Sequence, residues 1–294
     1  AAGSAAYIAC DALLATLGCV VCGHAATFLM RTECRGGIHR LAVERQRLLL
    51  ASPPAKGSIM LDSLRRLFVR ATSVANHQAV LDSAIGLKMI NHVEGDYLEF
   101  GVFKGDRLIQ AYETATFVSS RIRTGGDPYL AKASTRPLDE MRFFGFDSFE
   151  GLPKANAIDV VKGQEEWIGE GGFAATLDEV TRLMPKKGIE SGRIKLVKGW
   201  FNETLTPQTK QELGIKAAAI VYVDCDFYES AVPALEFVTD LLVDGSILIF
   251  DDWWIFKGRS DRGEQRAFRE WQEKHQIQAR EFIPGTAMSF MINR

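Results

Sequence analysis

The chain has 294 residues, of which 47% are hydrophobic and 24% are charged, and its formal net charge is -2. This length and composition fit one large α/β domain, or such a domain with an N-terminal extension. A nearly neutral chain without a long basic run argues against nucleic acid as the main partner, because phosphate binding needs clustered Lys and Arg.

Residues 1–56 are predicted to be an N-terminal extension that is poorly structured or helical. Residues 12–30 are almost uncharged, but glycines and polar residues weaken them as a bilayer span. We therefore do not expect membrane association, and a membrane anchor or targeting segment is the alternative. Residues 39–50 form a basic helical patch, which ends at Ser52-Pro53-Pro54.

The cysteines are concentrated in this extension. Only Cys225 lies beyond it, whereas a disulfide framework would spread cysteines over the fold. The main domain is therefore expected to be reduced and cytoplasmic. Cys19 and Cys22 have CxxC spacing, but no second pair follows at zinc-ligand spacing, so a metal or redox role is not expected there.

Residues 57–96 are predicted to be a helical cap segment. Their apolar residues recur at helical spacing, which indicates two or three helices that cover the next domain or meet a partner subunit. A homo-oligomer is therefore an open expectation. The residues that carry the pattern are Leu61, Leu64, Leu67, Phe68, Val80, Leu81, Ile85, Leu87 and Met89.

Residues 97–294 alternate strand and helix signals. Short apolar runs predict strands at 97–100, 142–147, 194–198, 218–224 and 245–251, and helical patterns fall at 107–120, 174–184, 231–243 and 263–275. This alternation predicts βαβ crossovers and a doubly wound sheet buried on both faces. Residues 278–283 and 287–292, around a Pro284-Gly285 turn, predict a terminal antiparallel hairpin. Residues 119–137 and 156–172 are predicted loops, the second a candidate lid.

The stretch YLEFGVFKGD at 97–106 organises this domain, because it reads as a strand, a carboxylate, two glycines and a helix start. In an open α/β sheet, ligands bind beyond the carboxyl ends of the strands. Those ends carry Glu99, Asp147, Lys198-Gly199, Asp224 and Asp251-Asp252. Grouped carboxylates are costly unless a cationic or hydrogen-bonding partner meets them, so a sulfonium ligand or a metal ion is expected.

Individual residues at this edge have both a functional and a plain structural interpretation. Gly101 and Gly105 would let the backbone approach a ligand, or they would only form a turn. Glu99 is expected to bind the amino group or the sulfonium side of S-adenosylmethionine (SAM). Asp147 stands where ribose hydroxyls find an acidic acceptor, or it caps the turn that follows it.

The densest acidic cluster is Asp224-Cys225-Asp226 with Asp251-Asp252. The fourth and fifth strands are expected to be adjacent, which would bring these groups together. Oxygen ligands without a His or Cys set favour Mg²⁺ or another hard divalent cation over zinc. Asp251 and Asp252 can both reach a metal only if the strand has already broken into a loop. Helix caps and turn acids are the alternative.

Five motifs in order resemble the TylF/MycF-type (macrocin O-methyltransferase-like) family of class I SAM-dependent methyltransferases: YLEFGVFKGD, GFDSFEGLP, KGWFNETL, VDCDFYES and IFDDWW. The resemblance covers residues 97–294 and implies a Rossmann-like, seven-stranded sheet with a reversed terminal strand. It implies Mg²⁺-assisted methylation of sugar hydroxyls of natural products.

The resemblance also implies roles for individual residues. Asp224, Asp251 and Asp252 become metal ligands, and Glu99, Gly101, Asp147 and Ser148 become SAM contacts. The stretch Gly199-Trp200-Phe201 would lie near the adenine. Trp253-Trp254 stands where a single aromatic residue is expected, which leaves the acceptor side open.

The predicted reaction is methyl transfer from SAM to a hydroxyl, most plausibly a sugar hydroxyl of a natural product or polysaccharide. A divalent ion would favour the alkoxide, and Asp224 is the candidate proton acceptor. The alternatives are an NAD-dependent oxidoreductase on a Rossmann sheet, which lacks support because GxGxxG is absent, and a non-catalytic binding protein that retains the fold.

Overall fold

The computed structural model describes residues 77–125, 133–160, 169–189 and 192–294. All of them belong to the compact unit Arg66–Arg294. The predictions for residues 1–56, and those for the part of the cap segment before residue 77, lie outside the described residues. Residues 77–90 are helical, as the periodicity of the cap segment indicates.

The described part of the chain contains a seven-stranded mixed sheet in the order β3-β2-β1-β4-β5-β7-β6. Strands β1 to β5 are parallel, whereas β7 runs antiparallel to both β5 and β6, so the terminal strand is reversed as expected. The strands are β1 (Asp96–Phe100), β2 (Phe143–Asp147), β3 (Ile194–Lys198), β4 (Ala218–Val223), β5 (Leu242–Phe250), β6 (Gln278–Glu281) and β7 (Met288–Asn293).

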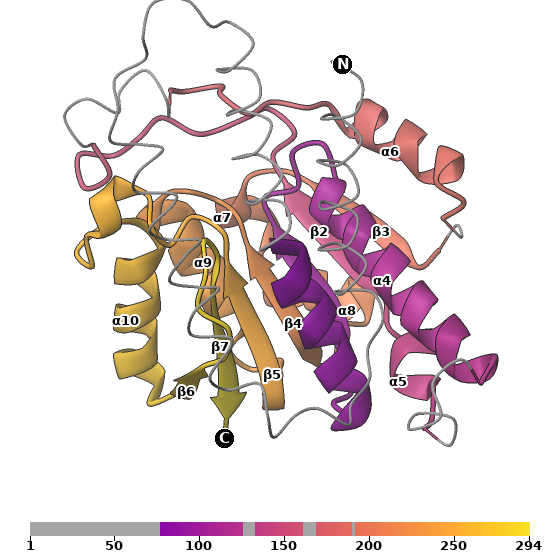
Figure 1. Ribbon diagram of the computed structural model, residues 1–294. Coiled ribbons are helices and arrows are strands. Elements are labelled where there is room, and N and C mark those ends of the chain that lie inside the picture. The colour runs from indigo at the N-terminus through magenta and orange to yellow at the C-terminus, as the bar shows by residue number, and fades with distance from the viewer. Residues whose placement is uncertain (1–76, 126–132, 161–168, 190–191) are drawn as a thin grey trace, which may run out of the picture. The chain divides into compact units, whose positions relative to one another are not determined.

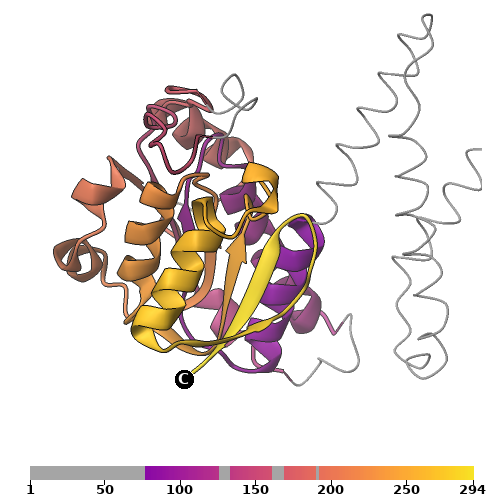
Figure 2. The same cartoon turned by 90° about the vertical axis from the view of Figure 1, so that its left-hand side faces the viewer.

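Helices cover both faces of this sheet (Figure 1). Helix 77–90, α4 (Asp106–Arg123), α5 (Arg136–Asp139) and α6 (Leu177–Lys186) contribute to one hydrophobic core. Helices α7 (Phe201–Thr204), α8 (Pro207–Leu213), α9 (Tyr228–Val238) and α10 (Gly263–His275) pack on the second core. Figure 2, turned by 90° so that the left-hand side of Figure 1 faces the viewer, shows α10 beside the terminal hairpin β6–β7.

Strand β1 illustrates why two cores form. All five of its residues are buried, and alternation along the strand sends them to opposite faces. Tyr97 enters the core under helix 77–90 and α4, whereas Leu98 and Phe100 enter the core under α9 and α10. Edge strand β3 differs from the prediction, since its residues are only partly buried or exposed.

Several element boundaries differ from those predicted. Helix α9 ends at Val238 and β5 begins at Leu242, although helix was predicted to continue to residue 243. The apolar run at this boundary fits both the helical and the strand periodicity. Leu242 belongs to the strand because it pairs with Ala218 of β4. Short helices α5, α7 and α8 were not predicted, because segments this short carry too few apolar repeats.

Backbone hydrogen bonds align the carboxyl ends of four strands in one row. Gly101 N donates to Phe146 O, Asp224 N to Phe100 O and Asp251 N to Val223 O, each at 2.9 Å. This row lies at the edge of the sheet opposite the arrowhead of β7, at the top of Figure 1. None of the described helices is both long and apolar enough for a membrane crossing.

Candidate functional site

The order of the strands reverses between β1 and β4, and a crevice at such a switch point is where open α/β sheets bind ligands. Glu99 lies on β1, and Asp224 directly follows β4. Asp147 ends β2, and Asp251 and Asp252 follow β5. The structure therefore brings the acidic residues singled out in the sequence to one edge of the sheet, at this switch point.

Three of these carboxylates are close enough to share a cation. Asp224, Asp251 and Asp252 each present an oxygen, and the three oxygens lie within 4.8 Å of one another. Strand β5 ends at Phe250, and Asp251 and Asp252 lie in a bend, which is the break that both side chains need to point at the same place. All three residues are half-buried.

The electrostatics of this triad fit a hard divalent cation. Burial, and then the charges of Asp251 and Asp252, raise the pKa of Asp224 well above its ordinary range. Burial and neighbouring Asp226 and Asp251 do the same for Asp252. Oxygen donors that are crowded and desolvated in this way favour an ion such as Mg²⁺, which would relieve their repulsion. The donor set therefore fits the metal that the resemblance implies.

Two more acidic residues extend the triad toward α10. Glu264 is 1% exposed, and its Oε2 accepts a hydrogen bond from Asp252 N at 3.1 Å. Burial and Asp252 raise the pKa of Glu264 well above its usual range. Asp226 N donates to Asp252 Oδ2 at 3.1 Å, and burial with the charge of Asp251 raises the pKa of Asp226 to about 7. Sequence reasoning missed Glu264, because it opens a helix that no motif connects to β5.

On the other side of the triad, Asp251 is held by residues of two further elements. Tyr222 on β4 donates its hydroxyl hydrogen bond to Asp251 Oδ1, and His77 Nε2 lies 3.3 Å from the same oxygen. His77 is 7% exposed and belongs to the helix that precedes β1. This helix therefore contributes to the site, which its apolar spacing alone did not indicate.

Glu99 lies within β1, one residue before its end, and is 1% exposed. Tyr97 donates its hydroxyl hydrogen bond to Glu99 Oε2 at 2.5 Å. Burial is the main reason that the pKa of Glu99 rises from 4.5 to about 8, although the Tyr97 hydrogen bond and the charge of Arg107 partly oppose this rise. The charge of Arg107 alone does not bring the pKa of Glu99 back to its ordinary value, so a second cation beside Glu99 would favour its ionised form.

Asp147 is bound by backbone donors of two loops. Its Oδ2 accepts from Val102 N at 2.7 Å and from Phe103 N at 3.0 Å, and its Oδ1 accepts from Phe149 N at 2.6 Å. Asp147 thus caps the turn after β2, which was the structural alternative, and it also holds the glycine loop after β1. Neighbouring Ser148 is buried, and its hydroxyl donates to Gly151 O at 3.0 Å.

The structure explains the glycine at position 101 by a close contact within the protein, not by the approach of a ligand. Its φ is 91°, and a Cβ at this position would lie 1.7 Å from Asp224 O. The end of β1 thus approaches the backbone of Asp224 too closely for any side chain at position 101. A Cβ on Gly105 would meet Val180 at 2.9 Å, and one on Gly199 would meet Thr204 at 2.6 Å. These glycines are required by contacts within the protein.

The aromatic residues near the site divide between core and surface. Phe201 packs edge-on against Phe100, with ring centroids 5.9 Å apart, and Trp200 precedes it as the N-cap of α7. Trp253 lies in an aromatic cluster that includes Phe250, at 5.2 Å. Trp254 is 53% exposed, and its indole nitrogen donates to Gly285 O at 2.9 Å. Trp253 therefore has a packing role, and Trp254 faces the solvent two residues after Asp252.

Residue Asp159 connects the loop after β2 to the starts of α9 and α10. It is fully buried, and its two carboxylate oxygens accept from Tyr228 N at 2.8 Å and from Gly263 N at 2.9 Å. Arg262 donates to the carbonyl of Ile158 in the same loop. One carboxylate therefore satisfies the first backbone N–H of two helices, and it fixes the segments that carry Asp226 and Glu264.

Replacing Asp159 by alanine is expected to lower the free energy of unfolding by about 2–4 kcal/mol, because two buried N–H groups lose their acceptors. Chemical denaturation of the purified chain measures this loss. Asp178→Ala is the matched control, since its ion pair with Arg182 (3.4 Å) is exposed and contributes less than about 0.5 kcal/mol. Equal stability of the two variants would contradict the assigned role of Asp159.

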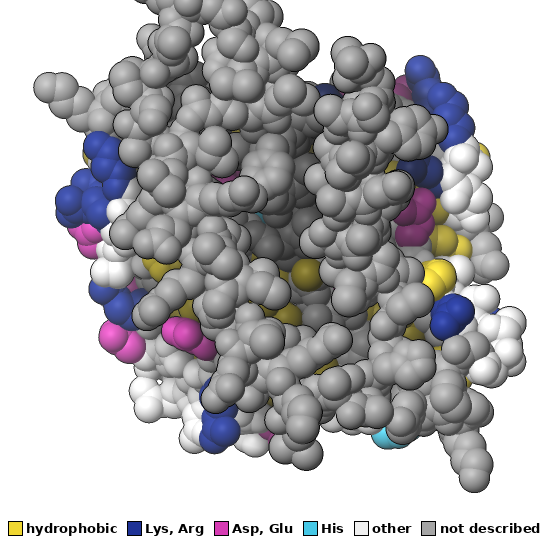
Figure 3. All heavy atoms as spheres, viewed as in Figure 1, with side chains coloured by type: hydrophobic (Ala, Val, Ile, Leu, Met, Phe, Trp, Pro, Cys, Tyr) yellow, Lys and Arg dark blue, Asp and Glu magenta, His cyan; other side chains and the backbone are white. Residues whose placement is uncertain are grey.

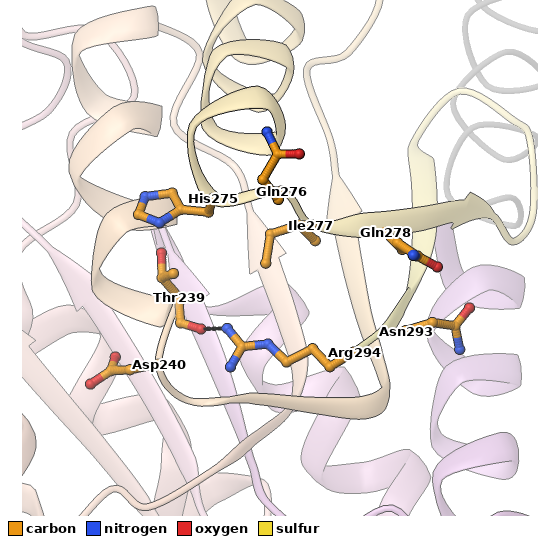
Figure 4. Close-up of a pocket in the computed structure, with 8 residues that line it drawn as sticks. All are labelled: Thr239, Asp240, His275, Gln276, Ile277, Gln278, Asn293 and Arg294. Atoms are coloured by element: carbon orange, nitrogen blue, oxygen red, sulfur yellow. Dashed lines mark hydrogen bonds between the residues drawn. The ribbon is translucent and has the colours of Figure 1, made fainter.

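A hollow at the opposite edge of the sheet lacks the features of a reaction site (Figure 4). It has a volume of about 520 Å³ and lies around Thr239, His275 and Arg294. Arg294 donates to Thr239 O, and His275 pairs with Glu236 at 3.0 Å, so these polar groups are already engaged. On the described surface seen in Figure 3, acidic and basic side chains are interspersed and form no patch of one sign.

The sheet order, the reversed terminal strand and the acidic residues at the switch point define the class I methyltransferase fold. The sequence profile of the family described as Macrocin-O-methyltransferase (TylF) matches residues 74–283. The chain belongs to this family. The match begins before Tyr97, so it includes helix 77–90, which the motifs read from the sequence left out.

Three relatives illustrate the similarity. The chain is 27% identical over 191 residues to the 8-demethyl-8-(2,3-dimethoxy-alpha-L-rhamnosyl)-tetracenomycin-C 4'-O-methyltransferase of Streptomyces olivaceus; the match covers 60% of this chain and 64% of that enzyme. The crystal structure of the calicheamicin methyltransferase CalS11 is 26% identical, with a TM-score of 0.56, over 84% of this chain and 89% of that one. The O-methyltransferase NovP shares the fold at 20% identity, with a TM-score of 0.56, over 74% and 80% of the two chains.

Proposed function

We propose that this protein transfers the methyl group of SAM to a hydroxyl of a sugar carried by a natural product, with the help of Mg²⁺ or another hard divalent cation. The observation that carries this proposal is the carboxylate triad Asp224, Asp251 and Asp252 beside Glu99 at the switch point. Membership of the TylF family supports the reaction class. The name of the Streptomyces relative supports a rhamnose-type acceptor.

The cofactor is assigned to the crevice between β1 and β4. We propose that Glu99 receives the cationic end of SAM and that Gly101, Gly105, Asp147 and Ser148 shape the loops around it. Gly199, Trp200 and Phe201 follow β3 and are proposed to border the adenine. In support, Asp147 accepts backbone hydrogen bonds from the loop after β1, so the loops that follow β1 and β2 are joined.

The acceptor is assigned to the triad side of the crevice. Asp224, Asp251 and Asp252 would hold the cation, which acts as a Lewis acid and lowers the pKa of a bound hydroxyl. We propose that Asp224 accepts the proton of that hydroxyl, because it belongs to the carboxylate triad at which the hydroxyl would be held. The carboxylates and the loops also orient the acceptor oxygen toward the methyl group.

Mass spectrometry tests the function directly. The full chain is incubated with SAM carrying an isotopically labelled methyl group, with Mg²⁺, and with a panel of rhamnosylated natural products. We expect the label in a sugar methoxy group of at least one acceptor. A matched panel in which every sugar hydroxyl is already methylated is the control. Equal labelling of both panels would contradict a sugar hydroxyl as the acceptor.

Glu99 makes SAM binding depend on pH in a predictable direction. Because the pKa of Glu99 is about 8 in the free protein, its ionised form becomes common only as the pH rises toward that value. Calorimetry is expected to show SAM affinity rising between pH 6.5 and 8.5, and Glu99→Gln should bind SAM at least about tenfold more weakly and lose this slope. Equal SAM affinity of the two proteins would refute the assignment.

The same shift has a consequence for stability. The pKa of Glu99 is raised above its unfolded value of 4.5, so its contribution to stability is complete below that value and is lost as the pH rises through about 8. The free protein should therefore become less stable over this window, and Glu99→Gln should remove part of the decrease.

The cytoplasmic location and the homo-oligomer stay predictions.

A further inference from the structure

The proposed cofactor carries a negative group that the acidic rim alone cannot bind. SAM has a sulfonium and an ammonium group, which suit carboxylates, but its methionyl part also ends in a carboxylate. Placed among Glu99, Asp147, Asp224 and Asp251, that carboxylate would be repelled and would lose its water. A cation of the protein has to lie near Glu99 if the rim is to accept the whole amino-acid end of SAM.

Arg107 is in the required place. It is the second residue of α4, directly after the loop that contains Gly105, and it is half-buried. Its charge lowers the pKa of Glu99. Burial disfavours the Arg107 charge, but Tyr222, Asp251 and Asp224 outweigh that effect, so the pKa of Arg107 is raised. The charge of Arg107 therefore interacts with Glu99, Asp224 and Asp251, the acidic residues at the switch point.

A second observation concerns Gln110, which is the hydrogen-bond partner of Arg107 on α4. Its Nη1 donates to Gln110 Oε1 at 3.1 Å, one turn further along α4. The amide nitrogen of Gln110 is buried, and it has no acceptor among the residues that the structure describes. A buried donor left without an acceptor costs about 1–3 kcal/mol. Arg107 and Gln110 thus offer adjacent donors, and a carboxylate of a ligand would satisfy them.

We propose that Arg107, supported by Gln110, binds the carboxylate of the methionyl part of SAM, while Glu99 binds the ammonium group. The inference rests on the proposed function, and it adds a determinant of cofactor specificity. The pair Glu99 and Arg107 recognises a zwitterion, so the site selects SAM over a nucleoside sulfonium that lacks the carboxylate. Arg107 also neutralises part of the rim before the cofactor binds.

The test compares SAM with decarboxylated SAM, which keeps the sulfonium and the amine but has no carboxylate. Both are titrated by calorimetry into the full chain, into Arg107→Gln and into Arg107→Lys. Arg123→Gln is the matched control, because Arg123 lies on the same helix, is exposed and pairs with half-buried Asp139. Thermal unfolding of each variant without ligand records any effect on folding.

The wild type should bind SAM roughly 10- to 100-fold more tightly than decarboxylated SAM, which is the range of a charge-assisted hydrogen bond. Arg107→Gln should lose this factor for SAM but bind the decarboxylated dication as well as the wild type or better, since a positive charge is removed. Arg107→Lys should keep most of the preference, and Arg123→Gln all of it.

Two results would overturn the inference. If Arg107→Gln weakens both ligands by the same factor, Arg107 only supports the fold or Glu99, and the proposed function stands. If the variant binds SAM as the wild type does, the carboxylate lies elsewhere. Failure of the wild type to bind either ligand would instead contradict the proposed function itself, and the inference would fall with it.

Discussion

Asp252→Asn is expected to lower Mg²⁺-dependent turnover at least about 100-fold while leaving the free protein as stable as the wild type, or more stable. The loss of turnover follows because one of three carboxylates that converge within 4.8 Å no longer carries a charge for the cation. The gain in stability follows because desolvation and the charges of Asp226 and Asp251 raise the pKa of half-buried Asp252 and so disfavour its ionised form. Asparagine keeps the shape and the oxygen that accepts from Asp226 N.

Two measurements check this prediction separately. Calorimetric titration with Mg²⁺ should give weaker binding for Asp252→Asn, and thermal unfolding in a chelator should show no loss of stability. Glu270→Gln is the control, since Glu270 lies on α10 but pairs with Arg266 at 2.8 Å, away from the triad. The stronger change Asp252→Ala removes the oxygen as well. Undiminished turnover of either Asp252 variant with added Mg²⁺ would exclude the metal from the mechanism.

Opposite effects on activity and stability are what a ligand-binding cluster of like charges should give. Residues that only cap turns stabilise the protein when they are present, as Asp159 does through two helix starts. Asp224 and Asp252 instead lie where burial and neighbouring charges disfavour ionisation. A protein that keeps such groups together gains from them only when a cation is bound.

The sequence predicted the sheet and its acidic edge because both depend on local signals. Apolar runs mark the buried strands, and a carboxylate directly after a run must lie at the strand's end. The adjacency of Asp224 and Asp251 then follows from the topology, since β4 and β5 pair in parallel. The strand was predicted to run to residue 251, but β5 ends at Phe250, and the bend at Asp251 and Asp252 is the break that both side chains need to reach one cation.

Other parts of the site depend on contacts between distant segments, which no local pattern records. Asp159 meets Gly263 across 104 positions of the chain, and Glu264 meets Asp252 only because α10 returns to the end of β5. In the sequence, Arg107 looks like an ordinary helical residue, because its acidic neighbours Glu99, Asp224 and Asp251 come from β1 and from the loops after β4 and β5. The sequence shows that such residues exist, but only the packing of helices on the sheet brings them to the crevice.

Gly101→Ala is expected to destabilise the protein by about 3 kcal/mol or more and to weaken metal binding in whatever fraction still folds. The added Cβ would lie 1.7 Å from Asp224 O and 2.7 Å from Asp224 C, and φ is 91°. A side chain in this backbone conformation costs roughly 1–2 kcal/mol, and overpacking adds about 1–3 kcal/mol. The clash can be relieved only by moving β1 away from Asp224, which displaces a proposed metal ligand.

Gly188→Ala separates the two causes, because Gly188 has a φ of 67° but a Cβ there meets nothing within 4 Å. This control should lose only the conformational part, about 1 kcal/mol, and should bind Mg²⁺ as the wild type does. The difference between the variants in denaturant unfolding measures the contact of the end of β1 with the backbone of Asp224. If both variants lose the same stability, that contact does not constrain the chain, and the cofactor loop and the triad are then mechanically independent.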